Sequence, residues 1–243
     1  MPRRGPHLRP EMILPTMSYP EAAAAAEREI GTCRKKILDC VGRFGSLVKK
    51  SSYRTAFPME KLYTVTSRDR TDIYVNCVAR RRSDWDSPSF HVFVPFHMQR
   101  GLFSVALSQR RNILIFTDHF FTRYRERILR DDSLSALDVV TLFHRRNSDI
   151  VISRDTKAYS RSYAKYETGE LPAIAARCPD GNCFGEFADR RTIVIRTIIS
   201  DEMLRDGQDD AFSRLEDRRR LYNTLLDKEY RNAVKTIKDN DTP

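Results

Sequence analysis

Between residues 61 and 116 the sequence repeatedly switches between short runs of β-branched or aromatic residues and polar stretches. Runs of this length and composition are typical of β-strands bounded by turns or loops. Most of the polar stretches are too short to hold a crossover helix, so consecutive strands are expected to pair antiparallel. The segment therefore predicts an antiparallel meander, with strands at residues 62–66, 73–78, 90–96, 103–107 and 113–116.

Helical patterns lie on both sides of this β-rich segment. A run of five alanines favours helix, and apolar residues recur about every 3.6 positions as far as Val48, which predicts an N-terminal helix over residues 20–50. After the meander, Thr117 opens a second helical pattern that residues 131–133 interrupt, which predicts a helix pair over residues 118–146. A DNA-reading helix-turn-helix is the less favoured interpretation of this pair, because it lacks the usual glycine turn.

The rest of the chain returns to strand texture and then to a helix. Residues 150–200 are β-rich and contain a Pro-Asp-Gly-Asn turn signal, and a narrow apolar stripe among charges predicts a C-terminal helix. The expected fold class is α+β, with antiparallel sheet(s), a central helix pair, and N-terminal and C-terminal helices. The expected organisation is a flexible, basic, Pro-rich arm at 1–19, one α+β body at 20–207, and the C-terminal helix and tail at 208–243.

Composition and cysteine usage favour a cytoplasmic protein. No apolar run approaches the roughly 20 residues that a membrane-spanning helix requires, so no membrane association is expected. The five cysteines are an odd number spread thinly along the chain, which is typical of reduced thiols rather than of a disulfide framework. The first residues lack the apolar stretch of a secretory signal, and Met17 is as plausible a start as Met1.

The net charge of +10 favours an anionic partner, and one cationic stripe stands out on the helix expected after residue 117. At about 100° per residue, one side of this helix is apolar, and the other carries a histidine and three arginines. These four residues are His119, Arg123, Arg127 and Arg130. The simpler interpretation is a surface helix with a charged side, on which Glu126 offsets the arginines.

The stripe also contains the residue types that a metal-independent ribonuclease uses. Such an enzyme needs a group with a pKa of about 7 to move protons at the 2′-hydroxyl and at the leaving oxygen, and guanidinium groups to hold the charge on phosphorus. His119 would shuttle the protons. Arg123, Arg127 and the strand residue Arg196 would hold phosphate, because a guanidinium can bind it through two parallel hydrogen bonds.

This part of the chain resembles a known family. The stretch from Phe116 to Arg127 has the pattern His-x3-Arg-x3-Arg after a strand, and a second helix at Ser135–Phe143 and a strand-turn-strand unit at 182–199 follow it. Residues 113–199 thereby resemble the core of BrnT-type toxins of the RelE-like ribonuclease superfamily. The resemblance implies a compact, basic α+β domain that cleaves RNA and is restrained by an antitoxin.

Two further clusters combine positive charge with aromatic rings. Cations neutralise phosphates and aromatic rings stack on unpaired bases, so both clusters are candidate contacts for single-stranded nucleic acid. With Arg130, their candidate residues are Arg80, Arg81, Arg82, Trp85, Lys157, Arg161 and Lys165. The alternative for the first cluster is a solvated loop, and the alternative for the second is a set of tyrosines that pack against the body.

The sequence predicts neither a metal site nor a cofactor. His91 and His97 share one face of a strand but have no carboxylate or cysteine at ligand spacing, and Cys178 and Cys183 lack a second ligand pair. Phosphate-binding loops, dinucleotide-binding loops and the serine-hydrolase motif do not occur.

Two hypotheses for the function follow. The first is an intracellular nucleic-acid-associated protein with RNA as the favoured partner, which extends to a metal-independent, toxin-like ribonuclease. The second is a non-catalytic adaptor or structural protein that binds a protein partner, or forms a homodimer, through its basic faces and terminal helices.

Overall fold

The computed structural model describes residues 13–108, 112–153, 174–204, 212–221 and 224. The helical elements are α1 (Tyr19–Thr32), α2 (Arg34–Lys50), η1 (Arg82–Asp86), α3 (Asp118–Tyr124), η2 (Arg125–Leu129), α4 (Ala136–Arg146), η3 (Asp201–Met203) and residues 212–221. The strands are β1 (Met59–Thr66), β2 (Asp72–Ala79), β3 (Ser89–Met98), β4 (Gly101–Leu107), β5 (Ile113–Phe116), β6 (Val151–Ser153), β7 (Ile174–Cys178), β8 (Gly181–Phe187) and β9 (Thr192–Ile199).

The nine strands form one mixed sheet in the order β1-β2-β3-β4-β5-β9-β8-β7-β6. Strands β1 to β5 are an antiparallel meander, and β6 to β9 are a second one. The two meanders meet where β5 pairs parallel with β9, and the chain between them includes α3 and α4. The prediction of an α+β fold with a first meander over residues 61–116 is confirmed, and the single parallel pairing makes the sheet mixed.

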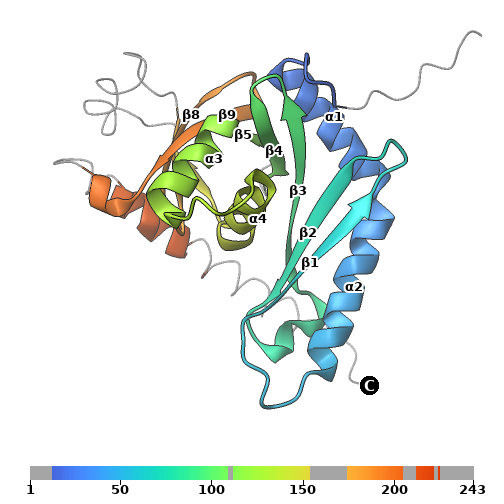
Figure 1. Cartoon of the computed structure of the whole chain (residues 1–243). Helices are drawn as coiled ribbons and strands as arrows, with labels where there is room; N and C mark the ends of the chain where they lie inside the picture. Colours follow the sequence, from blue (N-terminus) through green and yellow to red (C-terminus); the bar gives the residue numbers. More distant parts are fainter. Residues whose placement is uncertain (1–12, 109–111, 154–173, 205–211, 222–223, 225–243) are drawn as a thin grey trace, which may run out of the picture.

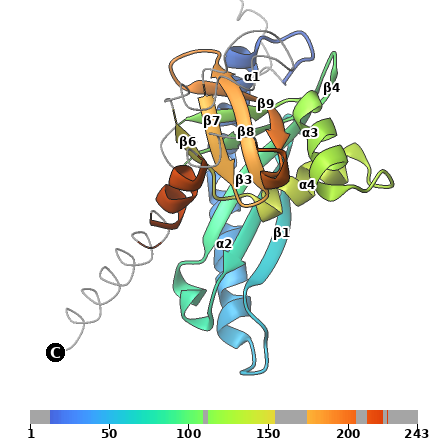
Figure 2. The ribbon, with the colours of Figure 1, turned by 90° about the vertical axis from the view of Figure 1, so that its left-hand side faces the viewer.

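Helices cover both faces of this sheet. On one face, α1 and α2 bury residues such as Ile37 and Phe44 against β1 to β5. On the other face, Phe120, Tyr124 and Phe143 of α3 and α4 form an aromatic core with β3, β4, β5 and β9. Figures 1 and 2 show α2 along the β1–β2 hairpin, with α3 and α4 on the opposite side of the sheet.

The N-terminal helix is divided in two at Cys33. The amide of Cys33 bonds to both the Glu29 and the Ile30 carbonyl oxygens, and the Thr32 hydroxyl donates to the Glu29 carbonyl oxygen. Gly31 and Thr32 are weak helix formers, and a hydroxyl bonded to the preceding turn bends a helix. The prediction of one helix over 20–50 is therefore wrong at this point, because the bend separates α1, over β4, β5 and β9, from α2, over β1 and β2.

The predicted helix pair at 118–146 is present. Helix α3 continues into the π-helical turn η2 and ends at Arg130, whose φ of 53° is left-handed. Ser135 caps the N-terminus of α4. Its hydroxyl accepts from the Asp138 amide, and the Asp138 carboxylate accepts from the Ser135 amide. This reciprocal cap satisfies amides of the first turn that have no partner within the helix.

Several other predictions have structural outcomes. Ile13 and Met17, assigned to the flexible arm at 1–19, pack against the core beside α1. All five cysteines are buried and free. Residues 212–221 are helical, as expected for part of the segment 208–243, and the rest of that segment lies outside the described residues apart from residue 224. Within the part of the chain that the structure describes, no helix has the length and apolar character that a membrane crossing needs.

Candidate nucleic-acid interface

The cationic stripe of the central helix pair lies where the sequence predicts it, on α3 and η2. His119 is exposed in the first turn of α3, behind Thr117, whose hydroxyl accepts from the Phe120 amide at 3.2 Å. Three arginines follow it along the same side, and each bonds to the protein itself. Arg123 pairs with Glu126 at 2.9 Å, Arg127 donates to the Ile198 carbonyl oxygen at 2.9 Å, and Arg130 pairs with Glu202 at 3.2 Å.

Arg196 does not join this stripe. Its guanidinium pairs with Glu186 and lies over the ring of Tyr19, with Cζ 5.7 Å from the ring centroid. Tyr19 belongs to α1, which packs on the face of the sheet opposite to α3. The predicted combination of Arg196 with Arg123 and Arg127 in one phosphate clamp is therefore not formed.

The side of α3 and α4 near the β7–β8 turn contains a polar network that the sequence analysis missed. The Tyr124 hydroxyl donates to Asp180, which also accepts from Asn147 at 2.8 Å and pairs with Arg146 at 3.0 Å. Burial and the Asp180 carboxylate raise the pKa of Tyr124 well above its usual range. The four side chains of this network come from three separate segments and satisfy one another's hydrogen-bonding groups. The network therefore joins the β7–β8 turn to the helix pair.

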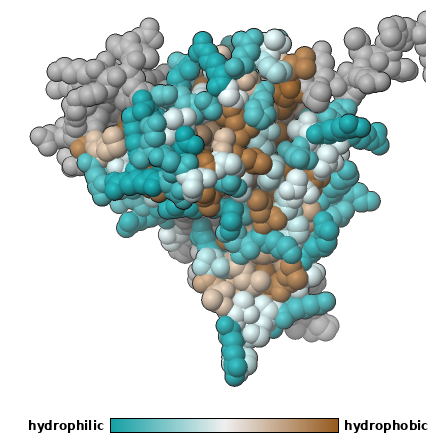
Figure 3. Space-filling model, viewed as in Figure 1, coloured by the Kyte–Doolittle hydropathy of each residue, from teal (hydrophilic) through white to brown (hydrophobic). Residues whose placement is uncertain are grey.

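A second cationic cluster forms at one end of the molecule, where the last turn of α2, the loop at 51–58 and η1 come together. Figure 1 shows these segments at the lower end of the ribbon, and Figure 3 shows hydrophilic side chains protruding there. The cluster, here called the basic tip, contains six cations and two aromatic rings. Its members are Lys49, Lys50, Tyr53, Arg54, Arg80, Arg81, Arg82 and Trp85.

Close packing between α2 and η1 holds the basic tip together. The Asp84 carboxylate accepts from the Arg80 and Arg81 amides at 2.9 and 3.1 Å and so caps η1. Gly45 is buried in α2, and a Cβ atom at this position would collide with the Trp85 carbonyl oxygen. Glycine therefore allows η1 to lie directly against α2.

Positive charge and aromatic surface are interleaved in the basic tip. Lys49 Nζ lies 4.3 Å from the centroid of the Trp85 ring, and Arg82 donates to the Lys49 carbonyl oxygen at 3.1 Å. Arg54 lies over the Tyr53 ring at 5.4 Å. The Tyr53 residue is 84% exposed and Trp85 is 40% exposed, so both rings present surface to solvent. Asp84 and Asp86 are the two carboxylates in η1, fewer than the six cations of the tip.

Sequence reasoning found half of this cluster. Arg80, Arg81, Arg82 and Trp85 lie close together in the sequence, whereas Lys49, Lys50, Tyr53 and Arg54 come from the end of α2 and the loop that follows it. The available signal was a tyrosine close to three basic residues in the stretch 49–54. The other predicted contacts, Lys157, Arg161 and Lys165, lie outside the described residues.

The described residues also settle the geometry of the histidines and cysteines. His91 is in hydrogen-bonding contact with His144, whereas His97 is exposed. Cys178 and Cys183 are neighbours across the β7–β8 hairpin, with their sulfur atoms 3.8 Å apart. Among the residues that the structure describes, no three His, Cys, Asp or Glu side chains are grouped so that they could hold a metal ion.

Comparison with known proteins gives no relative of this chain. No family model matches the sequence, and no match was found among curated proteins or among solved structures. The likeness to BrnT-type toxins therefore stays a prediction from the residues alone.

Proposed function

We propose that this protein binds single-stranded RNA through the basic tip. The observation that supports this most is that two exposed aromatic rings and six cations, from segments about 30 residues apart, gather at one end of the fold. Lysine and arginine side chains neutralise backbone phosphates, and aromatic rings stack on unpaired bases regardless of their sequence.

In the basic tip, a cation lies over one side of each aromatic ring. Lys49 covers one side of the Trp85 ring and Arg54 covers one side of the Tyr53 ring, so a base would stack on the opposite side of each. A base stacked on the solvent side of either ring would place the phosphates of its nucleotide and its neighbours close to the surrounding arginines. RNA is the preferred partner because proteins bind it mostly at single-stranded segments whose bases are available for stacking.

RNA cleavage at His119 is a second proposal, supported by the exposure of this imidazole on a stripe that Arg123 and Arg127 share. In its present arrangement Arg123 binds Glu126 and Arg127 binds the backbone of β9, so a substrate phosphate would have to compete with these partners. At the basic tip, Arg81 pairs with Asp84 and Arg82 donates to the Lys49 carbonyl oxygen, but six cations gather there beside two exposed aromatic rings. RNA binding at the basic tip is therefore the function that we favour.

The test is a titration of a fluorescently labelled single-stranded RNA with the full chain in the presence of a chelator, read by anisotropy. We expect saturable binding that Lys50→Glu weakens about tenfold or more and Tyr53→Ala weakens by a similar factor, since one stacked base is worth about 1–3 kcal/mol. The matched control is Lys35→Glu, which makes the same charge change at the other end of α2.

Each outcome separates the hypotheses. Equal losses in Lys50→Glu and Lys35→Glu would show that net charge, rather than the basic tip, drives binding. Fragments ending in a cyclic phosphate that disappear in His119→Ala would support the ribonuclease proposal. The absence of both binding and cleavage would leave the adaptor or self-association hypothesis, which sedimentation analysis of the full chain then tests.

A further inference from the structure

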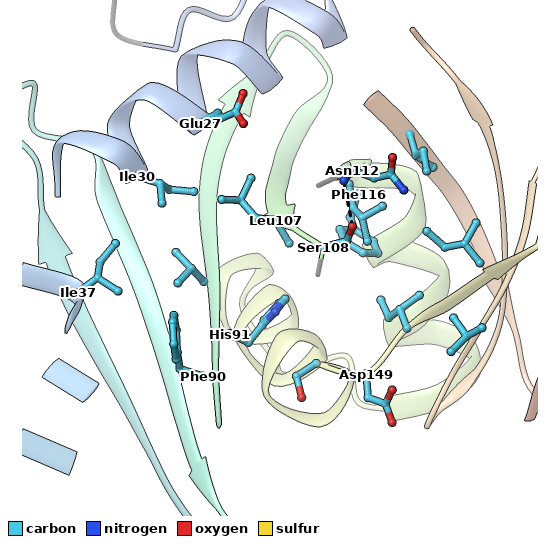
Figure 4. Close-up of a pocket in the computed structure, with 18 of the residues that line it drawn as sticks. Glu27, Ile30, Ile37, Phe90, His91, Leu107, Ser108, Asn112, Phe116 and Asp149 are labelled. Atoms are coloured by element: carbon cyan, nitrogen blue, oxygen red, sulfur yellow. Dashed lines mark hydrogen bonds between the residues drawn. The ribbon is translucent and has the colours of Figure 1, made fainter. Parts of the chain in front are cut away.

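A large cavity lies away from the basic tip, between the two N-terminal helices, the central strands and the segment after α4. Its volume is about 1160 Å³, slightly above the usual range for small-molecule sites, about 300–1000 Å³. Figure 4 shows Ile30 and Ile37 on the side of α1 and α2, and Asn112 and Phe116 on the side of β5. Residues 150–152 and Leu221 complete the apolar part of the wall.

The inner wall of the cavity contains one imidazole, and this imidazole is held in a buried chain of hydrogen bonds. His91 Nε2 lies 3.1 Å from His144 Nδ1, and His144 Nε2 lies 2.7 Å from the Ser104 hydroxyl. Phe93 stacks on His144, which is fully buried. Burial lowers the pKa of His91 to about 4 and that of His144 well below its usual value. The imidazole is therefore neutral at pH 7, and this part of the wall combines apolar side chains with uncharged polar groups, which include Ser108 and Asn112.

The charges of this cavity are found in four residues: Glu27, Arg34, Asp149 and Arg218. Glu27 pairs with Arg191, and Asp149 pairs with Arg219, each at 2.7 Å. Arg34 and Arg218 are exposed, and no carboxylate among the described residues pairs with either. Within the described part of the chain, both guanidinium groups are thus available to a ligand, while both acidic groups are paired with arginines.

We propose that this cavity binds an anionic amphiphile, with its apolar body against the inner wall and its carboxylate at Arg34, while Arg218 is a second cation of the lining. Arginine binds carboxylates through paired hydrogen bonds, and the apolar lining favours a hydrocarbon or aromatic body. The position of the charges selects against a cation, and the uncharged inner wall selects against a ligand that is polar throughout.

The test uses 11-(dansylamino)undecanoic acid as a fluorescent probe and the full chain as the protein. We expect a saturable rise and blue shift of dansyl emission with one probe per chain. Arg34→Glu should weaken the acid about tenfold or more, whereas Lys35→Glu, which changes the adjacent exposed residue outside the cavity, should leave its affinity within about twofold. The carboxamide of the same probe should bind more weakly and be insensitive to Arg34→Glu.

A second pair of variants tests the apolar wall. Leu38 and Leu47 are both exposed leucines of α2, and Leu38 lines the cavity whereas Leu47 does not. We expect Leu38→Asp to weaken the probe and Leu47→Asp to leave it unchanged, with equal circular dichroism confirming that both are folded. Unsaturable binding, equal affinity for acid and amide, or equal effects within either matched pair would overturn the proposal. None of these outcomes depends on RNA, so the two proposals fail separately.

Discussion

His91 and His144 illustrate what single residues reveal and conceal in this sequence. The alternation along β3 correctly places His91 and His97 on one face of the strand, yet His91 is half-buried against His144 of α4 and His97 is exposed. His144, the partner of His91, is 53 residues away in the sequence, and no motif or spacing predicts this contact. The strand pattern predicts which way a side chain points, but only packing decides what it meets.

The lowered pKa values of the two histidines predict that the folded state loses stability in mild acid. Between pH 6.5 and about 4, His91 is protonated in the unfolded chain but stays neutral in the folded protein. The free energy of unfolding therefore falls as the pH is lowered through this window. One pKa unit corresponds to about 1.4 kcal/mol, so His91 contributes up to about 3 kcal/mol to this loss. Urea unfolding at pH 7 and at pH about 4.5 measures it.

The matched variants for this measurement are on the same strand. His91→Gln should show a smaller loss between the two pH values, because it removes one of the groups that protonates on unfolding. His97→Gln, which changes an exposed position of β3, should keep the loss of the unmodified protein. An undiminished loss in His91→Gln would contradict the lowered pKa of this imidazole.

Among the elements, β9 shows where alternation along a strand no longer predicts which face of the sheet a side chain points to. Ile195 and Ile198 both face the core beneath α3, although strict alternation would place residues three positions apart on opposite faces. A register shift opposite Phe184 and Gly185 accounts for this, and Gly185 leaves the room that a closely approaching β9 backbone needs. The face of Arg196 could not be derived from the sequence, because the shift falls at this residue.

One carboxylate of the helix at 212–221 joins this helix to β7, in addition to the buried contacts of Phe212 and Leu215. Glu216 accepts hydrogen bonds from Arg219, Arg220 and Arg177, and these lower its pKa to about 2. We expect Glu216→Gln to reduce the free energy of unfolding by about 1–3 kcal/mol and to increase amide exchange in residues 212–221. Because the folded pKa is lowered, the contribution is complete above about pH 4.5 and is lost as the pH falls towards 2.

Asp217→Asn is the control for the Glu216 substitution. Asp217 is the next residue of the same helix and is exposed, so its loss should leave both stability and exchange close to those of the unmodified protein. Exchange that rises equally in both variants would show that the charge of the helix, and not its attachment to Arg177 on β7, keeps it in place.

At the scale of the whole molecule, composition and element order predict the class of fold and the first meander, but not how the parts meet. Ile30 and Ile150 line the same cavity, and Lys49 and Trp85 share the basic tip, although each pair is far apart in the sequence. Local periodicity describes individual elements. Sites formed by several elements depend on the curvature and pairing of the sheet, which local patterns do not specify.

The distribution of charge over the molecule predicts how RNA affinity responds to salt. Each phosphate contact made by a single strand contributes about 0.7 to the slope of log affinity against log salt concentration. The double variant Lys50→Gln/Arg54→Gln should therefore have a slope shallower by about 1.4. The double variant Lys35→Gln/Lys36→Gln at the other end of α2 should keep the original slope, and equal slopes in both double variants would contradict binding at the basic tip.

The single parallel pairing between β5 and β9 also has a consequence for synthesis. Ribosomes release the first meander long before β9 exists, so β5 leaves the exit tunnel with a row of unsatisfied amides and carbonyls along one side. This nascent half is open to pairing with neighbouring chains until translation of residues 192–199 closes it. Yield in a cell therefore depends on how quickly the ribosome reaches the ninth strand, and on chaperones that shield the fifth in the meantime.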